Sequence, residues 1–309
     1  MEEIIKFLGL ENNVGQNAVM LDKSLFRLLE SKKPECTVYA IDGGSATIID
    51  GATWCISKLK VGVVSYKNGK RLSEKVEGFM LGISKNKNKL SSKLQPHIEG
   101  FRLESGKSSM EDLENASRSI LEWLKLRQLV LQANKGDIIL RDGAFSSDDA
   151  YEKSLINGVI ELCKQKGIHL VGICKTSRAS TPGGRPLIGM LNEFSSKEFH
   201  DKKWIYDEGG TAIAKLHEKS DFCFRIESSH VNLLPNALSH ICYYSTDPEF
   251  IGYPYPLLKA DKIARVRDFE KNNDNRKAKM LAKSLGNQFM EFDERATLVH
   301  DMLDKRAYR

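Results

Sequence analysis

The chain has 309 residues, of which 41% are hydrophobic and 28% are charged, and its formal net charge is +6. This composition is ordinary for a folded protein and excludes an intrinsically disordered chain, and the length suits one elaborate domain or two small ones. A positive balance of this size permits a polyanionic partner without requiring one.

Six cysteines are spread along the sequence, several within apolar runs, and none has the spacing of a zinc site. Buried reduced thiols are the simplest interpretation and predict a cytoplasmic location. No window reaches the roughly 18 apolar residues of a membrane span, and the N-terminal "MEEIIKFLGLENN" is acidic and amphipathic rather than a secretion signal. We therefore expect a soluble intracellular protein with no membrane partner.

The first third of the chain predicts helix followed by strands. Residues 2–31 have apolar residues at near-helical spacing, and Pro34 ends that segment. Three strand-like runs follow, at 36–42, 52–66 and 71–81. Asn68-Gly69 between the last two favours a tight hairpin turn, so the core is expected to open with an antiparallel meander.

Beyond a lysine-rich stretch without a clear pattern (84–107), helices and strands alternate. "SSMEDLENASRSILEWLKLRQLVLQANKG" predicts a long helix that begins at Ser108 or Ser109 and ends at Gly136. A strand and turn (137–146), a helix (148–167) and a strand (168–177) come next. Such alternation implies parallel pairing with right-handed crossovers. The order predicts an α/β fold with an RNase H-like core at 34–185: a mixed five-stranded sheet flanked by helices.

The rest of the chain, 186–309, predicts C-terminal helical and strand additions to this core. We expect a helix at 187–200, strands at 211–217, 221–228 and 238–247, and helices from 257 onward. With no internal repeat and no low-complexity linker, residues 1–309 are predicted to form one domain, in which residues 1–33 are an N-terminal helical segment.

Two aspartates, Asp42 and Asp142, each follow an apolar run and each precede glycine. If the first and fourth strands are adjacent, both carboxylates emerge at the same edge of the sheet, and glycine lets the backbone turn away there. Clustered carboxylates need a cation to stay ionised, and hard oxygen ligands favour Mg²⁺ or Mn²⁺. Taken singly, each Asp-Gly favours an ordinary turn, whereas the pair at corresponding strand ends favours a metal site.

The long helix should supply a third metal ligand. Glu122 is the predicted one, and Arg118 one turn earlier is placed to orient it or to reach a phosphate. Glu111, Asp112 and Glu114 lie nearer the helix start, where acids usually complement the helix dipole, and composition alone does not separate these candidates well.

Several segments together resemble the NurA nucleases, archaeal and bacterial DNA-end-processing enzymes encoded with the HerA helicase. The segments are "YAIDGGSA", "RSILEW", "DIILRDGAFS", "VGICKTS" and "IGYPYPLLKADKIARV", in the expected order from about residue 36 to the C-terminus. The resemblance implies manganese-dependent cleavage of single- and double-stranded DNA, a homodimer, and a hexameric HerA-type ATPase partner. It also implies that residues 186–309 complete the active site and the dimer.

The resemblance further assigns site residues. It makes Asp42, Glu122 and Asp142 the metal-binding acids and adds Asp261, which follows the "PYPL" element, although Asp261 could instead hydrogen-bond within its helix. Lys175 matches a family lysine that would contact the scissile phosphate, while a solvated lysine at a strand end is the alternative.

Other residues are candidates for DNA contacts. Arg118, Arg178 and Arg185 are predicted to bind phosphates, the last two from a loop at the edge of the acids. Tyr253 and Tyr255 would stack on bases, or else pack a turn. His300 corresponds to a similar element near the end of family members, with a helix-surface histidine as the alternative.

The sequence therefore predicts a metal-dependent DNA nuclease that hydrolyses phosphodiester bonds with two Mn²⁺ or Mg²⁺ ions. The expected activities are 5′–3′ exonuclease and single-strand endonuclease, in DNA end processing with a HerA-type translocase, for repair or phage defence. One alternative is an actin- or sugar-kinase-type phosphotransferase with a phosphate hairpin at 42–45. "GFRLESGKS" (100–108) does not add a P-loop, since it has one residue too many between its glycines. Another alternative is a catalytically inactive scaffold that binds DNA or a helicase.

Overall fold

The computed structural model describes residues 21–84, 87–90, 109–175, 179–180, 186–207 and 212–286. The strands are β1 (Phe26–Leu28), β2 (Thr37–Asp50), β3 (Trp54–Lys67), β4 (Lys70–Ser84), β5 (Lys87–Leu90), β6 (Ile138–Asp142), β7 (His169–Cys174), β8 (Trp204–Asp207), β9 (Ala212–Lys215) and β10 (Phe224–Ser228). The helices are α3 (Met110–Gln132), α4 (Ala150–Lys166), α5 (Leu187–Glu198), α6 (Leu234–Tyr243), α7 (Tyr255–Ala264) and α8 (Asp268–Ser284), with 3₁₀ turns η1 (Lys23–Leu25) and η2 (Val231–Leu233). No helix in these ranges is long and apolar enough to cross a bilayer.

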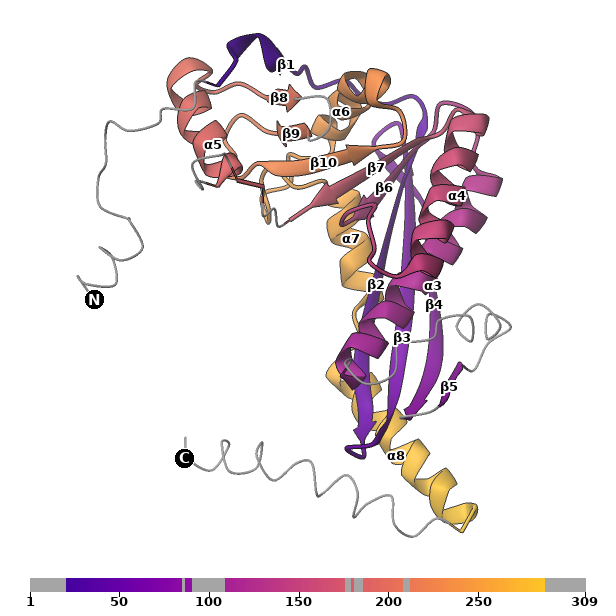
Figure 1. The fold of residues 1–309 in the computed structure, drawn as a ribbon. Helices are drawn as coiled ribbons and strands as arrows, with labels where there is room; N and C mark the ends of the chain where they lie inside the picture. Colours follow the sequence, from indigo (N-terminus) through magenta and orange to yellow (C-terminus); the bar gives the residue numbers. More distant parts are fainter. Residues whose placement is uncertain are drawn as a thin grey trace, which may run out of the picture.

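The described strands form one ten-stranded mixed sheet in the order β1-β8-β9-β10-β7-β6-β2-β3-β4-β5 (Figure 1). Its centre has the predicted RNase H-like order: β2, β3 and β4 are an antiparallel meander, β6 pairs parallel to β2, and β7 pairs parallel to β6. Asn68 and Gly69, with φ of 51° and 78°, make the predicted turn between β3 and β4. The sheet is wider than the five strands expected, because β10, β9, β8 and β1 extend it beyond β7, and β5 extends it beyond β4.

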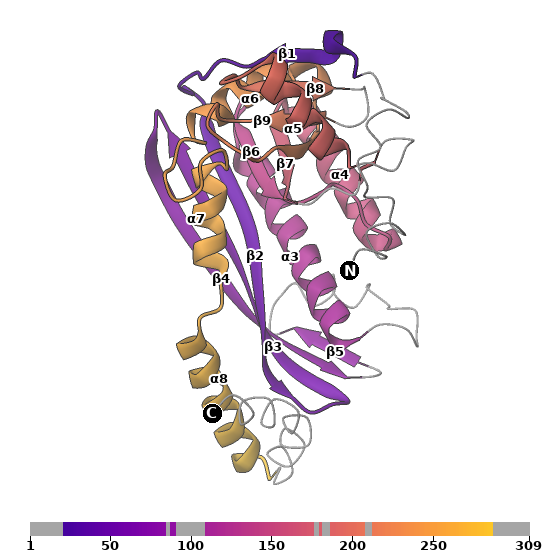
Figure 2. The same ribbon diagram turned by 90° about the vertical axis from the view of Figure 1, so that its left-hand side faces the viewer.

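Alternate side chains of the central strands enter two separate cores. Ala40 of β2 and Leu140 of β6 pack with residues of α6 and α7, whereas Ile41 and Ile139 pack with residues of α3 and α4. The two views of the ribbon show α3 and α4 on one face of the sheet and α7 on the other (Figures 1 and 2). Successive residues of β2 therefore contact different helices, which decides the neighbours of Asp42 and Gly43.

Strand β2 does not end at Asp42, so the predicted turn at Gly43 is wrong. The strand runs on to Asp50 and pairs with β3 along this length; the strand that ends here is β6. The glycines permit close approach instead: a Cβ on Gly43 would lie 2.3 Å from Oε1 of Glu122, and one on Gly44 would lie 2.3 Å from the carbonyl oxygen of Ala264. Both faces of β2 are thus packed too tightly for any side chain at these positions.

The predicted long helix is confirmed as α3. Ser109 is its N-cap and forms a capping box with Asp112, in which each side chain accepts a backbone N–H from the other's segment. The helix ends at Gln132, a full turn before Gly136, whose φ of 85° belongs to the loop that follows.

Residues 21–31 were predicted to be helical and contain η1 and β1 instead. β1 pairs antiparallel with β8, and the ring of Phe26 packs against four other rings, those of Phe194, Phe199, Trp204 and Tyr206. These long-range contacts outweigh the helical spacing of the local sequence. The remainder of that predicted segment, residues 2–20, lies outside the described residues.

The strand predicted at 238–247 is also wrong, because most of it belongs to α6. Leu234, Leu238, Ile241 and Cys242 are buried at helical spacing, and Pro235 occupies the first turn, where its missing N–H costs nothing. A short apolar run does not by itself distinguish a buried strand from a buried helix.

Candidate active site

Two of the predicted acids lie side by side where β6 ends. Ile41 of β2 pairs with Arg141 of β6, so Asp42 and Asp142 are the next residues on two adjacent parallel strands. Because side chains alternate along a strand, both carboxylates project to the face covered by α7. The predicted meeting of these two side chains is therefore what the topology produces, although only Asp142 is at a strand end.

Asp42 has a strongly perturbed carboxyl group. It is 7% exposed, and Oδ1 accepts the N–H of Gly43 at 2.8 Å. Burial, and then the charges of Glu122, Asp142 and Asp261, raise its pKa to about 8. Without a neighbouring cation, such a carboxyl holds its proton at neutral pH.

Lys175, directly after β7, is the cation nearest to this pair of aspartates. Its Nζ lies 2.5 Å from Oδ2 of Asp142 and 5.1 Å from the ring centre of Tyr253. Burial disfavours the ammonium, but the hydrogen bond to Asp142 and the charges of Asp142, Asp42 and Asp261 outweigh it, so the pKa of Lys175 is raised. The side chain is 49% exposed and can still move.

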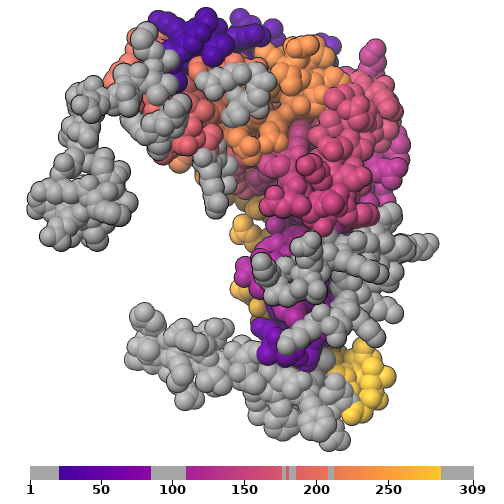
Figure 3. All heavy atoms as spheres, in the orientation of Figure 1, coloured from indigo at the N-terminus to yellow at the C-terminus, as the bar shows by residue number. Residues whose placement is uncertain are grey.

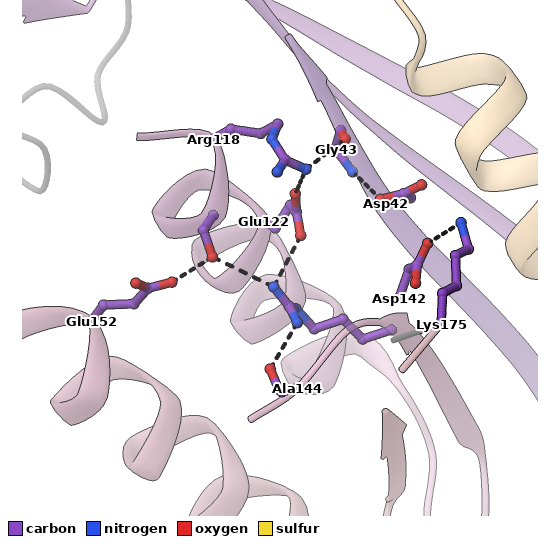
Figure 4. A network of polar contacts seen from close by, with 10 residues as sticks. Asp42, Gly43, Arg118, Glu122, Asp142, Ala144, Glu152 and Lys175 are labelled. Atoms are coloured by element: carbon purple, nitrogen blue, oxygen red, sulfur yellow. Dashed lines mark hydrogen bonds and ion pairs between the residues drawn. The ribbon is translucent and has the colours of Figure 1, made fainter. Parts of the chain in front are cut away.

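Glu122 comes from α3 on the other face of the sheet, where a Cβ on Gly43 would meet it, and is held between two guanidinium groups (Figure 4). Its Oε1 accepts Nη1 of Arg118 at 3.0 Å, and its Oε2 accepts Nη2 of Arg141 at 3.2 Å. Arg118 also donates to the carbonyl oxygen of Gly43 at 3.0 Å, which ties α3 to β2. Burial raises the pKa of Glu122, and the charges of Arg141 and Arg118 oppose that rise.

Arg141 is the residue that the sequence reading missed. It is 6% exposed, donates to the carbonyl oxygen of Ala144 at 2.9 Å, and lies 4.6 Å from the ring centre of Trp123. A weaker contact of 3.5 Å joins it to the hydroxyl of Ser119, which donates to the buried Glu152 (Figure 4). The signal was the arginine in the apolar strand "IILRD", since a buried guanidinium requires an acid partner.

The other acids near the start of α3 face elsewhere. Glu111 is exposed, and Asp112 serves the capping box. Glu114 is buried and accepts the hydroxyls of Thr47 and Ser57 on the meander. Of these acids on the helix, Glu122 is the one whose charge contributes to the raised pKa of Asp42.

Asp261 of α7 is the fourth carboxylate, and its charge contributes to the raised pKa of Asp42. Its Oδ2 also accepts Nη2 of Arg265 one turn later, at 3.1 Å. The hydrogen bond within its helix, the alternative expectation, is therefore present, and the role of Asp261 as a metal ligand stays a prediction.

The rings of Tyr253 and Tyr255 pack against other aromatic rings of the protein. Tyr253 is 3% exposed and packs on Phe224 and Phe250, so the prediction that it stacks on DNA does not fit and the alternative, turn packing, does. Tyr255 is half-buried and meets Tyr66 edge-on at 5.9 Å. Arg178, Arg185 and His300 lie outside the described residues.

The donor chemistry of this cluster fits a hard divalent cation. Every acid in it offers carboxylate oxygens, and Asp42 has no ion pair with any described residue, since Lys175 pairs with Asp142. Burial and the charges of Asp142 and Asp42 raise the pKa of Tyr253, so its hydroxyl keeps its proton. Within the described ranges no three acidic, histidine or cysteine side chains already surround one point, because Glu122 is turned to its arginines and Asp142 to Lys175.

A comparison with curated proteins finds no match. A family model for the NurA domain matches residues 36–209, more than half of the chain. Among solved structures, the chain resembles the NurA nuclease from Sulfolobus solfataricus at 14% identity, with 94% of this chain and 93% of that chain covered and a TM-score of 0.52. A second NurA structure matches at 12% identity, 93% and 96% coverage and a TM-score of 0.57, and a NurA structure with manganese at 11% identity, 85% and 93% coverage and a TM-score of 0.55. The structural matches agree in fold, and the family match confirms the resemblance seen in the sequence: the chain belongs to the NurA family of nucleases.

Proposed function

We propose that this protein is a deoxyribonuclease that hydrolyses phosphodiester bonds at the carboxylate cluster with Mn²⁺ or Mg²⁺. One observation carries the proposal: Asp42 lies beside Asp142 on the α7 face, and burial, followed by the charges of Glu122, Asp142 and Asp261, raises the pKa of Asp42 to about 8. A divalent cation would relieve this penalty at Asp42, which is the one acid of the four that forms no ion pair with a described residue.

The residues that would hold metal are Asp42, Asp142 and Glu122, with Asp261 adding an oxygen from α7. Two divalent ions bound there would supply an activated water and offset the charge of the leaving oxygen. Each oxygen of Glu122 already accepts one guanidinium N–H, and the partly exposed Arg118, at 31% of its side chain, is the easier partner to release when Glu122 turns to a metal. Arg118 would then face the substrate and bind a phosphate, as a planar guanidinium does well.

Lys175 has a role that follows from its present partner. Its ammonium neutralises Asp142, so it leaves that carboxylate when Asp142 is engaged elsewhere. Its raised pKa keeps it charged, and its half-exposed position lets it approach the scissile phosphate and stabilise the charge that develops there.

Finer aspects of the proposal come from the family. By resemblance we extend it to 5′–3′ exonuclease and single-strand endonuclease activity in DNA end processing, as a homodimer with a HerA-type hexameric ATPase in the cytoplasm. The likeness to a NurA structure with manganese favours Mn²⁺. Either DNA repair or phage defence would use such an enzyme.

The kinase-type alternative lacks its essential hairpin. Residues 42–45 are an unbroken part of β2 that pairs with β3, so they do not curl around a phosphate. The inactive scaffold remains as an outcome of the experiment that follows.

The test is digestion of end-labelled linear DNA, single- and double-stranded, with Mn²⁺, Mg²⁺ or EDTA. Wild type is compared with Asp42→Asn and Asp142→Asn, and with Glu111→Gln as a matched change on the exposed first turn of α3. We expect metal-dependent cleavage that both aspartate variants lose and the Glu111 variant keeps. Metal-dependent cleavage retained by both aspartate variants would move the site elsewhere, and no cleavage by wild type with either metal would favour the scaffold.

A further inference from the structure

Helix α8 separates its charges between two faces. Its sequence holds three acids and five lysines or arginines. Two of the acids point at the sheet: Asp274 accepts Nζ of Lys58 at 2.7 Å, and Glu270 pairs with Lys60 at 3.2 Å and with Lys58 at 3.6 Å. Lysines of β3 thus pair with Glu270 and Asp274, two of the three acids of α8, and the exposed Asp268 lies at the start of the helix.

The outer side carries a stripe of basic, aromatic and amide side chains. Phe269, Asn273, Arg276, Lys277 and Met280 recur at i, i+4, i+7, i+8 and i+11, which places them on one helical face. Phe269 is 65% exposed and Met280 is 72% exposed. Arg276 and Lys277 are exposed and make no ion pair with any described residue. We call these five residues the α8 stripe; it contains no acid.

The α8 stripe begins close to the carboxylates and leads away from them. Arg265, at the end of α7, pairs with Asp261, and its carbonyl oxygen accepts Nζ of Lys60 at 3.0 Å. Farther along, Asn275 donates to the carbonyl oxygen of Ile48 at 2.8 Å. Ile48 is six residues past Asp42 on β2, or about 20 Å at the rise of a strand. The first half of the helix therefore lies beside the part of the sheet beyond the carboxylates, and the rest projects past the sheet (Figures 1 and 2), where it forms surface at that end of the molecule (Figure 3).

We propose that the α8 stripe binds single-stranded DNA on its way to or from the carboxylate cluster. Arg276 and Lys277 would contact phosphates without regard to sequence, and Phe269 would stack on an unpaired base. The stripe spans 11 residue steps from Phe269 to Met280, or about 16 Å along the helix, which is enough for several nucleotides. A basic stripe free of acids favours this polyanion over a protein partner, and the inference rests on the proposed nuclease function for its link to the carboxylates.

The test is binding of a fluorescent oligothymidylate in EDTA over a range of salt concentrations. The variants are Arg276→Gln/Lys277→Gln and Phe269→Ala. The control is Lys135→Gln/Lys202→Gln, an equal loss of charge at exposed positions away from α8. Each lost phosphate contact reduces the slope of log K against log salt by about 0.7, so the double α8 variant should lose about 1.4. Phe269→Ala should weaken binding by about tenfold with the slope unchanged.

Two further readouts separate this inference from the nuclease proposal. All variants should keep the wild-type thermal midpoint, because the inward pairs of Glu270 and Asp274 are untouched, and should keep Mn²⁺-dependent hydrolysis of bis(p-nitrophenyl) phosphate, which is too small to reach α8. If the wild type cleaves no substrate but the salt slope of DNA binding is still smaller in the double variant, the nuclease proposal is refuted and the proposed DNA binding by the α8 stripe is supported. An unchanged salt slope in the double variant would overturn the inference. If the same variants then altered dimer formation or capture by an ATPase, the α8 stripe would be a protein-binding face instead.

Discussion

Replacing Gly43 by alanine tests the link between the backbone of β2 and the position of Glu122. The added Cβ would lie 2.3 Å from Oε1 of Glu122, 2.7 Å from its Cγ and 2.8 Å from its Cδ, whereas ordinary contact begins at 3.4 Å. The carboxylate must therefore retreat by about 1 Å, the gap between these contact distances. It is held from both sides at 3.0 and 3.2 Å by Arg118 and Arg141, so a retreat of this size breaks at least one pair.

Two magnitudes follow from this displacement. Overpacking in a filled core costs about 1–3 kcal/mol of unfolding free energy. The loss of one arginine partner by the buried carboxylate of Glu122 adds a further cost. We expect Gly43→Ala to lose about 2–4 kcal/mol of unfolding free energy. A misplacement of about 1 Å in a catalytic constellation also costs about 100-fold in rate.

The assays are urea denaturation in EDTA and DNA cleavage in Mn²⁺, with two alanine controls. Gly158 in α4 has nothing within 4 Å of the added Cβ, so Gly158→Ala should be neutral or slightly stabilising and fully active. Gly44→Ala meets the backbone of Ala264 on the opposite face, so it should destabilise by displacing α7 without touching Glu122. Full cleavage by a stable Gly43→Ala protein would refute the reasoning, because Glu122 would then not be needed where it is.

Three other changes have defined outcomes. Arg141→Lys should lower Mn²⁺ affinity, measured by electron paramagnetic resonance, by about tenfold, and Arg141→Met should lower it further, as expected for a residue that orients a ligand. Equal affinity in wild type and both variants would leave Arg141 a purely structural role. Lys175→Met should cut cleavage by about 100-fold yet leave Mn²⁺ affinity equal or tighter, because Asp142 loses a competing cation; a parallel fall in affinity would contradict this. In metal-free protein, the pKa of Asp42 is raised from 3.8 in the unfolded chain to about 8. The stability that protonated Asp42 contributes is therefore fully present below pH 3.8 and is lost as the pH rises through about 8. Asp42→Asn should therefore be more stable than wild type at pH 9 in EDTA, by as much as about 5 kcal/mol, with the gap closing toward pH 4; thermal unfolding measures it, and a gap independent of pH would count against the shifted pKa.

Features that depend on neighbours in the chain could be predicted from the sequence. Asn68-Gly69 sets the backbone angles of a hairpin turn, and Ser109 with Asp112 caps a helix, whatever the rest of the fold does. The order of strands and helices then restricts the core to an RNase H-like sheet. Because that order puts β2 beside β6, it also brings Asp42 next to Asp142, so the candidate aspartates follow from local patterns and one topological rule.

Features that depend on contacts between distant segments required the tertiary structure. The sequence "IDGG" is compatible with a turn or a strand, and the long pairing of β2 with β3 decides for the strand. The reason for Gly43 is then the carboxylate of Glu122, about 80 residues away, and the partner of that carboxylate is Arg141, which pattern reading treats as one residue of an apolar strand. The same holds for β1 and α6, whose local spacing was misleading because packing against partners remote in sequence outweighed it. By itself, the sequence determined which residue types stand at which turns, caps and strand positions, since these are short-range effects; the tertiary structure alone decided how the charges are balanced, because a buried charge is compensated by whatever folding brings within about 4 Å of it.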